Sequence, residues 1–294
     1  MEFIDKSSYQ EREKEICVAY LQACFNAETK TFYPAIDTDQ SYNNFSSKTL
    51  RKGKYGWESL LMREQNGRCC YCMRRLDRSV RNIEHVIPRN FETNNPQEEF
   101  SKYTQSSDIL RNYVMLSSEF SKLRFDSLEE ILEVKQMPHR IALQNMLVSC
   151  NGKFGFSRSG CCCNNARSND FLLPLMLMPC VVDRVHYDGI SGVMFVYPPD
   201  SSWNKIVELL NDDTYKEIRV LWYRIWKHKE QVNLEACKSF KCEERIKFMK
   251  LIFDKENLYD VPEAYQKYAG QEENEAVYWK MLLDFDWFFT YKWE

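Results

Sequence analysis

Apolar residues recur at helical spacing near the start of the chain. Residues 9–25 place Ile16, Tyr20 and Cys24 on one stripe and charged side chains elsewhere, which predicts an amphipathic helix. The following segment, residues 28–50, is polar and contains scattered aromatics, asparagines and serines. That composition predicts an irregular connection.

The middle of the chain also has a helical pattern, interrupted by turn signals. Residues 57–65 predict a short amphipathic helix that ends at Asn66-Gly67, a dipeptide typical of turns at helix ends. Residues 96–140 predict further helices, most clearly in the stretch SLEEILEVKQ. Residues 151–160 contain three glycines and two serines, which predict a mobile loop.

From about residue 202 helical spacing resumes, and we expect further helices over 238–252 and 274–290. Four large side chains share one helical face, namely Ile218, Leu221, Trp222 and Ile225. The last twenty residues are rich in aromatics, which either pack back onto the protein or form a docking face for a partner. We expect the region after about residue 200 to carry protein–protein contacts, because aromatic side chains are common interface anchors.

Length and composition bound the protein class. The chain has 294 residues and 44% hydrophobic residues, which suffices for two or three units around one main core. Its charged N-terminus predicts no signal peptide. No window approaches 18 uncharged apolar residues, so we expect a soluble cytoplasmic protein without a membrane contact.

The twelve cysteines are not a disulfide framework in a reducing compartment. Seven of them fall into two groups in the sequence. The first group is Cys69, Cys70 and Cys72, and the second is Cys150, Cys161, Cys162 and Cys163. Net charge is −3, which counts against a nucleic-acid binder acting alone. Arginines nevertheless crowd residues 63–89, where they predict either phosphate contacts or only a solvated surface.

Candidate chemistry begins with a C-x-x-C, Cys69 to Cys72, followed by Glu84-His85 in the segment IEHVIPR. A C-x-x-C is half of a zinc site, and zinc can hold a small hairpin that has too little core of its own. A carboxylate next to an imidazole supplies a ligand for a hard cation and a base for water. The alternative for His85 is an ordinary structural histidine.

Two asparagines are candidates for the second half of the motif. Asn112 lies in ILRNYVMLSSEF, which offers no second cysteine pair. Asn145 lies in LQNMLVSC and is followed by Cys150 and by the sequence CCCNNARSN. Only the second ending supplies the missing zinc ligands, so the sequence favours Asn145.

With these motifs in order, residues 60–180 resemble an HNH endonuclease of the ββα-metal type. They are most similar to the HNH nuclease subunits of Septu-type anti-phage systems, including those attached to retrons. That subfamily pairs a C-x-x-C with an I-E-H-x-x-P segment, then has N-L-L-x-S-C, a glycine-rich insertion and a final C-x-C motif. In this chain the N-L-L-x-S-C motif is NMLVSC, from residue 145, and the C-x-C motif is CCCNN, from residue 161.

The resemblance implies roles for individual residues. Glu84 would bind a divalent cation, most simply Mg²⁺, with Asn165 as the second ligand; His85 would be the general base, and Asn145 would orient the loop and the imidazole. The four structural zinc ligands would be Cys69, Cys72, Cys150 and Cys163. Contacts to flanking phosphates would come from Arg74, Arg75, Arg89 and Arg167.

Three features depart from the subfamily pattern. Asn165 carries no charge where the family often has histidine, which weakens cation binding. The segment between His85 and Asn145 is longer than expected, so 91–140 is interpreted as an insertion that contacts a partner or substrate. Cys161 is an alternative to Cys163 as the fourth zinc ligand.

The predicted fold is therefore α+β and mainly helical, with a zinc-stabilised ββα-metal HNH core. We expect a helical region over 1–60, the nuclease core over 61–180, and a helical, partner-binding region over 181–294. The predicted function is metal-dependent hydrolysis of phosphodiester bonds in DNA or RNA. By resemblance, the chain would be the effector of an anti-phage complex with an ATPase partner and, in retron-attached members, a reverse transcriptase with its nucleic acid.

Two other readings remain open. One is a zinc-stabilised module that binds nucleic acid or protein and has an inactive nuclease site. The other is an ordinary restriction or homing HNH nuclease, for which a DNA-reading module is expected. The C-terminal helices contain no basic recognition helix.

Overall fold

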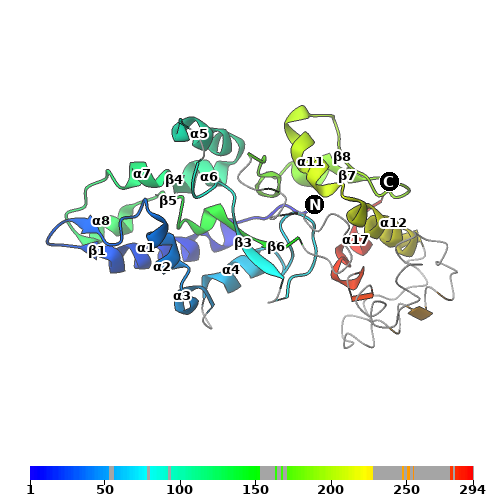
Figure 1. Cartoon of the computed structure of the whole chain (residues 1–294), viewed down its shortest axis with the longest axis horizontal. Helices are drawn as coiled ribbons and strands as arrows, with labels where there is room; N and C mark the ends of the chain where they lie inside the picture. Colours follow the sequence, from blue (N-terminus) through cyan, green and yellow to red (C-terminus); the bar gives the residue numbers. More distant parts are fainter. Residues whose placement is uncertain are drawn as a thin grey trace. The chain divides into compact units, whose positions relative to one another are not determined.

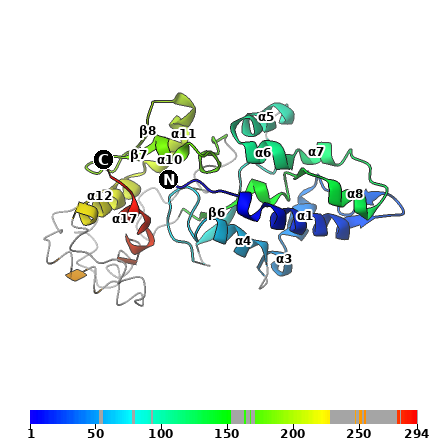
Figure 2. The same ribbon diagram turned by 180° about the vertical axis from the view of Figure 1, so that it is seen from behind.

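The chain forms two units, seen from opposite sides in Figures 1 and 2. The first comprises residues 1–70, 81–149 and 167–182, and the second comprises 71–80, 150–166 and 183–294. This computed structural model describes residues 1–52, 56–77, 80–91, 94–152, 163, 167, 171–227, 247, 250–251, 254, 279–280 and 282–293.

The first unit begins with the predicted N-terminal helix. A 3₁₀ turn, η1 (Ser7–Tyr9), leads into α1 (Gln10–Cys24), which is followed by an antiparallel hairpin of β1 (Phe25–Asn26) and β2 (Thr31–Phe32). The prediction for 9–25 is confirmed, but of the three stripe residues only Tyr20 is buried. The buried face instead contains Glu13, Cys17, Val18, Tyr20 and Leu21.

Helices also occupy the segment that we expected to be irregular. Its helices are α2 (Asp39–Phe45) and α3 (Lys48–Lys52). The Phe45 ring is fully buried and stacks on Trp57, with centroids 5.4 Å apart. Packing of Phe45 on Trp57 therefore stabilises α2, although the polar sequence of this segment does not predict a helix.

The predicted helix at 57–65 is confirmed as α4 (Trp57–Glu64). It ends where Asn66 and Gly67 adopt positive φ angles of 51° and 69°, as the Asn-Gly signal predicts. Trp57, Leu60 and Leu61 face the core.

The segment 96–140 is helical as predicted, although its helices are short. Ser127 caps α8 by accepting a hydrogen bond from the Glu130 amide, and α8 lies beside α1 (Figure 1). α5 and α6 also lie side by side, as both views show (Figures 1 and 2). The elements are α5 (Pro96–Ser106), α6 (Asp108–Tyr113), β4 (Val114–Met115), α7 (Ser117–Phe120), α8 (Leu128–Glu133) and β5 (Met137–Pro138), with β4 and β5 parallel.

Two longer strands carry the motif residues. β3 (Arg81–His85) pairs with β6 (Met146–Cys150), which follows the 3₁₀ turn η2 (Leu143–Asn145). All five residues of β6 are buried, and Glu84 is buried in β3. The later 3₁₀ turn η3 (Leu175–Leu177) is also buried.

The core of the first unit contains ions. Lys6 donates to Glu13 at 2.7 Å, to Glu64 at 2.8 Å and to the Leu143 carbonyl at 3.0 Å. All three charged side chains are fully buried. One cation thus joins the N-terminus to α1, α4 and the turn before β6.

The second unit is built on an aromatic core. Tyr187 lies against Trp287, Phe288, Tyr291 and Trp293, with ring centroids between 5.1 and 6.4 Å apart. The described aromatics at the end of the chain therefore pack within their own unit, which was one of the two alternatives. Its elements are α10 (Val181–Arg184), β7 (Val185–Tyr187), β8 (Met194–Val196), η4 (Ser201–Trp203), α11 (Asn204–Leu210), α12 (Asp213–Lys227) and α17 (Trp287–Thr290).

The helical face predicted around Trp222 is confirmed in α12, where all four of its residues are buried. The antiparallel hairpin of β7 and β8 was not predicted. The predicted loop at 151–160 and helix at 238–252 fall almost entirely outside the described residues. Of the predicted helix at 274–290, the structure describes 279–280 and 282–290, which are helical at 279–280, at 282–284 and in α17.

The fold is mixed α+β with small sheets, as predicted at that level. No helix among the described residues is both long and apolar enough to cross a membrane. The division into two units differs from the three predicted regions, because the segment 71–80 and the cysteines from 150 onward group with the C-terminal part.

Candidate functional site

Four cysteines gather into one buried cluster, as the sequence predicts. The sulfur atoms of Cys69, Cys72, Cys150 and Cys163 all lie within 4.8 Å of one another. The Sγ atoms of Cys72 and Cys150 are 3.8 Å apart. Two ligands of a tetrahedral zinc, each about 2.3 Å from the ion, lie about 3.8 Å apart, so the cluster fits a metal such as zinc.

Local backbone features bring these cysteines together. Met73 and Cys163 adopt positive φ angles of 62° and 51°, conformations that turn the chain sharply beside a ligand. Cys150 ends β6, and the two-residue spacing between Cys69 and Cys72 keeps that pair close through the covalent chain alone. Four sulfur ligands leave no open position, so a bound zinc would be structural.

Gln65 fixes the chain leading into the cluster, a role that the sequence did not reveal. Its amide nitrogen donates to the carbonyls of Arg68 and Val148, at 2.8 and 2.7 Å, and its amide oxygen accepts from the Val148 amide at 2.7 Å. The Cys70 amide donates to the same Val148 carbonyl at 3.1 Å. A buried side-chain amide with these partners fixes the position of the segment that carries Cys69 relative to β6.

Helix α12 contributes to the surroundings of the cluster. The Tyr215 hydroxyl lies 2.9 Å from the Cys163 sulfur, and both residues are buried. A hydroxyl donor stabilises the thiolate form of a metal ligand. Burial lowers the pKa of Arg219, one turn further along α12, and the neighbouring tyrosines and cysteines act in the opposite direction.

Glu84 and His85 lie at the end of β3, and a single arginine binds this stretch of chain. Arg167 forms a buried ion pair with the Glu84 carboxylate. Its guanidinium also donates to the His85 carbonyl at 2.7 Å and to the Val86 carbonyl at 2.5 Å. Arg167 was predicted to contact phosphate; in this structure its described contacts hold the backbone and carboxylate of the candidate site.

The His85 imidazole has a defined tautomer. Its Nε2 lies 3.2 Å from the Arg140 carbonyl oxygen, which can only accept, so Nε2 carries the proton and donates. Within the described part of the chain, Nδ1 has no hydrogen-bond partner and keeps its lone pair. Burial lowers the pKa of His85 to about 3, so the ring is neutral at physiological pH.

Tyr42 and Arg89 extend the site outward from His85. The Tyr42 ring stands edge-on to the imidazole at 4.8 Å, and the Arg89 guanidinium lies 4.4 Å from the Tyr42 ring centre. The Arg89 side chain is 37% exposed, and its nearest carboxylate, Asp39, is 3.8 Å away. Of the four arginines predicted to bind phosphate, Arg89 is the one whose guanidinium lies over Tyr42 beside His85, in a loose ion pair with Asp39.

Asn145 holds the loop that follows β3. Its side-chain oxygen accepts from the Ile87 amide at 2.7 Å, and its nitrogen donates to the carbonyls of Ile87 and His139 at 3.0 and 2.8 Å. Its own carbonyl accepts from the Val86 amide. The buried Asn145 amide therefore holds this loop, whereas the predicted contact with the His85 imidazole is not among its described hydrogen bonds.

The remaining predicted residues lie elsewhere. Arg74 pairs with Asp284 at 3.1 Å and Arg75 with Asp286 at 2.5 Å, so both bind carboxylates of the second unit. Asn165, the predicted second cation ligand, and Cys161, the alternative zinc ligand, lie outside the described residues.

Comparisons with known proteins leave the site to be judged on its geometry. No family model, no curated protein and no solved structure matches the chain.

Proposed function

We propose that this chain is a metal-dependent HNH endonuclease that hydrolyses phosphodiester bonds. The observation that carries the proposal is the orientation of His85, with Nε2 bonded to the Arg140 carbonyl at 3.2 Å and Nδ1 left as an acceptor beside the Glu84 position. An imidazole fixed in this way can take a proton from water at Nδ1. Its neighbour Glu84 supplies the carboxylate that a divalent cation needs.

Each described residue of the candidate site would have a separate role in hydrolysis. His85 would accept a proton from the attacking water, and Asn145 and the Arg140 carbonyl would keep the loop and ring in place. Arg89, exposed beside Tyr42, would bind a flanking phosphate. The buried Glu84 carboxylate and, beyond the described residues, Asn165 would hold a Mg²⁺-like cation, which supplies charge neutralisation at the phosphate.

The donor set fits such a cation in part. Glu84 supplies a carboxylate of the kind such a cation prefers, but the buried Arg167 guanidinium already neutralises it and would repel a second positive charge. Cation binding would require Glu84 to share its oxygens with, or release, Arg167. A structural zinc on the four cysteines would stabilise the region that leads into β3 and follows β6.

The same ion pair favours the second candidate, a zinc-stabilised binding module with an inactive site. In that case Arg167 would neutralise Glu84 permanently and no cation would bind. The ATPase partner and the role as an anti-phage effector rest on the resemblance to Septu-type subunits alone.

The test compares nicking of DNA and RNA by the purified full-length protein with and without Mg²⁺ or Mn²⁺. We expect His85→Ala to reduce the rate about 100- to 10,000-fold, the usual contribution of a general base. His186→Ala is the matched control, since this half-buried imidazole stacks on Phe195. Wild-type cleavage by His85→Ala would exclude this mechanism, and cleavage by neither protein under any metal would favour the binding module.

A further inference from the structure

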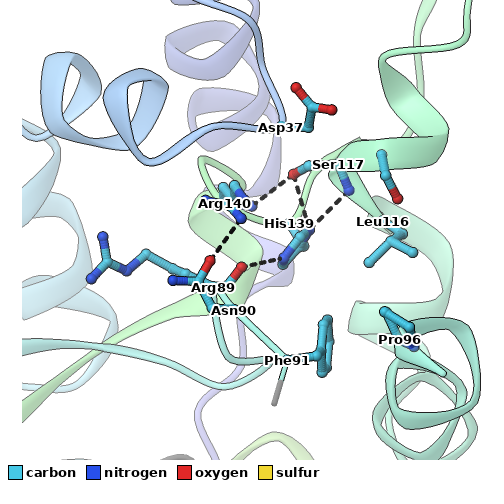
Figure 3. A pocket seen from close by; sticks show the side chains of 10 residues that line it. Asp37, Arg89, Asn90, Phe91, Pro96, Leu116, Ser117, His139 and Arg140 are labelled. Atoms are coloured by element: carbon cyan, nitrogen blue, oxygen red, sulfur yellow. Dashed lines mark hydrogen bonds between the residues drawn. The ribbon is translucent and has the colours of Figure 1, made fainter. Parts of the chain in front are cut away.

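A pocket of about 270 Å³ lies entirely within the first unit, around His139 (Figure 3). Its lining comes from the segment before α2, from the loops after β3 and β5, and from the starts of α5 and α7. Arg140 links the pocket to the site, because its side chain lines the pocket while its carbonyl holds the His85 ring. A molecule bound here would therefore lie close to the reacting phosphate.

The floor of the pocket is preformed. His139 Nδ1 accepts from the Ser117 amide at 2.9 Å, which places the ring proton on Nε2, where it is donated to the Arg89 carbonyl at 3.2 Å. The Ser117 hydroxyl bonds to His139 Nδ1 at 2.9 Å and accepts from the Arg140 amide at 3.3 Å. Both ring nitrogens are thus satisfied, so His139 shapes the pocket and is not a candidate for proton transfer.

The walls combine an aromatic face with polar groups. Phe91, Pro96 and Leu116 give apolar surface, and the half-buried Phe91 ring packs against His139 with centroids 5.9 Å apart. Asp37 lies on the opposite side of His139 in Figure 3. Among the described residues its carboxylate has neither a hydrogen bond nor an ion pair, so it is an acceptor available to a ligand.

Charge is arranged unevenly between the pocket and its rim. Inside the pocket, the Arg140 guanidinium is already paired with Asp39 at 2.8 Å and bonded to Asn90 at 2.7 Å, which leaves the Asp37 carboxylate to repel an anion. At the rim, the Arg89 guanidinium points away from His139 (Figure 3). It lies 4.4 Å from the centre of the Tyr42 ring, which contacts His85. A ligand that suits both places has an uncharged, planar, donor-bearing part for the pocket and a phosphate for the rim. A nucleotide has this construction.

From these contacts we propose that the pocket binds the base of one unpaired nucleotide flanking the scissile phosphate, stacked on Phe91 with an amino edge toward Asp37. The volume lies just below the usual range for small-molecule sites, about 300–1,000 Å³, and so suits a single nucleotide unit and not a duplex. The carboxylate favours bases with amino donors, guanine, adenine and cytosine, over uracil and thymine. This assignment rests on the proposed nuclease function for its placement beside the reacting phosphate.

The experiment measures binding of short single-stranded oligonucleotides, each with one variable base in an otherwise uniform uracil or thymine strand, to the full-length His85→Ala protein without divalent cation. We expect Phe91→Ala to weaken binding about 5- to 150-fold, the range for loss of one base–aromatic stack, and Phe91→Trp to retain it. Asp37→Asn should remove the preference for an amino base. Matched controls are Phe195→Ala, a 40% exposed ring of the second unit, and Asp108→Asn, an exposed carboxylate.

Zinc content and thermal unfolding show whether the Phe91→Ala protein remains folded. Unchanged oligonucleotide affinity in folded Phe91→Ala would overturn the assignment. Tighter binding of free mononucleotides than of oligonucleotides would overturn it as well, because the pocket would then serve a soluble nucleotide. The two proposals fail separately: full cleavage by a His85→Ala protein would refute the nuclease mechanism and leave Phe91-dependent binding intact.

Discussion

Both units have apolar cores, but the two cores differ in the ionic and aromatic contacts that they contain. The first unit buries ions, with Lys6 between Glu13 and Glu64, and a second buried pair of Arg167 with Glu84. The second unit buries rings, gathered around Tyr187. Buried charges fix a specific arrangement but cost free energy if one partner is removed, whereas ring packing depends on area and shape. The candidate catalytic pair lies in the unit whose core contains buried ion pairs, which are sensitive to pH and to the loss of a single charge.

The largest effect should come from the cysteine cluster. Cys72→Ser removes one of four ligands, and structural zinc contributes on the order of 10 kcal/mol in small zinc domains, so we expect loss of the ion and unfolding of the adjoining hairpin. Elemental analysis and limited proteolysis measure both results. Cys180→Ser is the control, because this half-buried cysteine lies outside the cluster. A folded wild-type protein without any metal would contradict the prediction.

The buried ions come next. Lys6→Met leaves Glu13 and Glu64 without their cation in a site closed to water, which should reduce the free energy of unfolding by about 3–5 kcal/mol. Burial already raises the pKa of Glu13, against the opposing effect of Lys6. Adding Glu64→Gln to Lys6→Met should restore part of the loss.

Chemical denaturation measures this difference. Lys102→Met is the matched control, because Lys102 forms an exposed i,i+3 pair with Glu99 and such pairs contribute less than about 1 kcal/mol. An equal decrease in the free energy of unfolding for both variants would mean that burial does not strengthen the Lys6 ion pairs. The proposed difference between the two cores would then be wrong.

Acid should weaken the first unit through its buried imidazoles. Burial lowers the pKa of His139 to about 4, whereas an unfolded histidine titrates near 6.5. Between these values the unfolded chain binds a proton that the folded chain does not, so stability falls as pH decreases from about 6.5 to 4. His139→Gln should flatten this pH dependence, measured as the denaturation midpoint at several pH values, and His186→Gln in the second unit should not.

Features that depend on residues close together in the sequence could be predicted, whereas contacts between residues far apart in the sequence could not. The C-x-x-C spacing, the Asn66-Gly67 turn and the face of α12 all depend on neighbours within a few residues, and each was predicted. By contrast, α2 forms because Phe45 packs on Trp57, a contact that no local pattern indicates.

The candidate site shows the same limit. Glu84, His85 and Asn145 were identified from their motifs, but the groups that set their state lie far along the chain. The carbonyl of Arg140 is 55 residues from His85, and Arg167 is 83 residues from Glu84. Every residue has a backbone carbonyl, so no side-chain pattern could have indicated that the Arg140 carbonyl binds His85. Arg167 was predicted as a site residue, but its partner was expected to be a phosphate.

The smallest effect tests whether the aromatic unit also contributes a polar contact to the cluster. Tyr215→Phe removes one hydroxyl, 2.9 Å from Cys163, and keeps the ring in its packing against Phe285. A single hydrogen bond contributes about 0.5–1.5 kcal/mol, so stability should change little. Without the donor, however, the Cys163 thiolate should protonate more readily, and zinc should be lost to a chelator faster and at a higher pH than in wild type. A colorimetric chelator assay across pH measures this, with Tyr223→Phe, on the same helix, as the control. Identical zinc release from both variants would mean that Tyr215 acts only through its ring, and that the second unit contributes shape alone around Cys163.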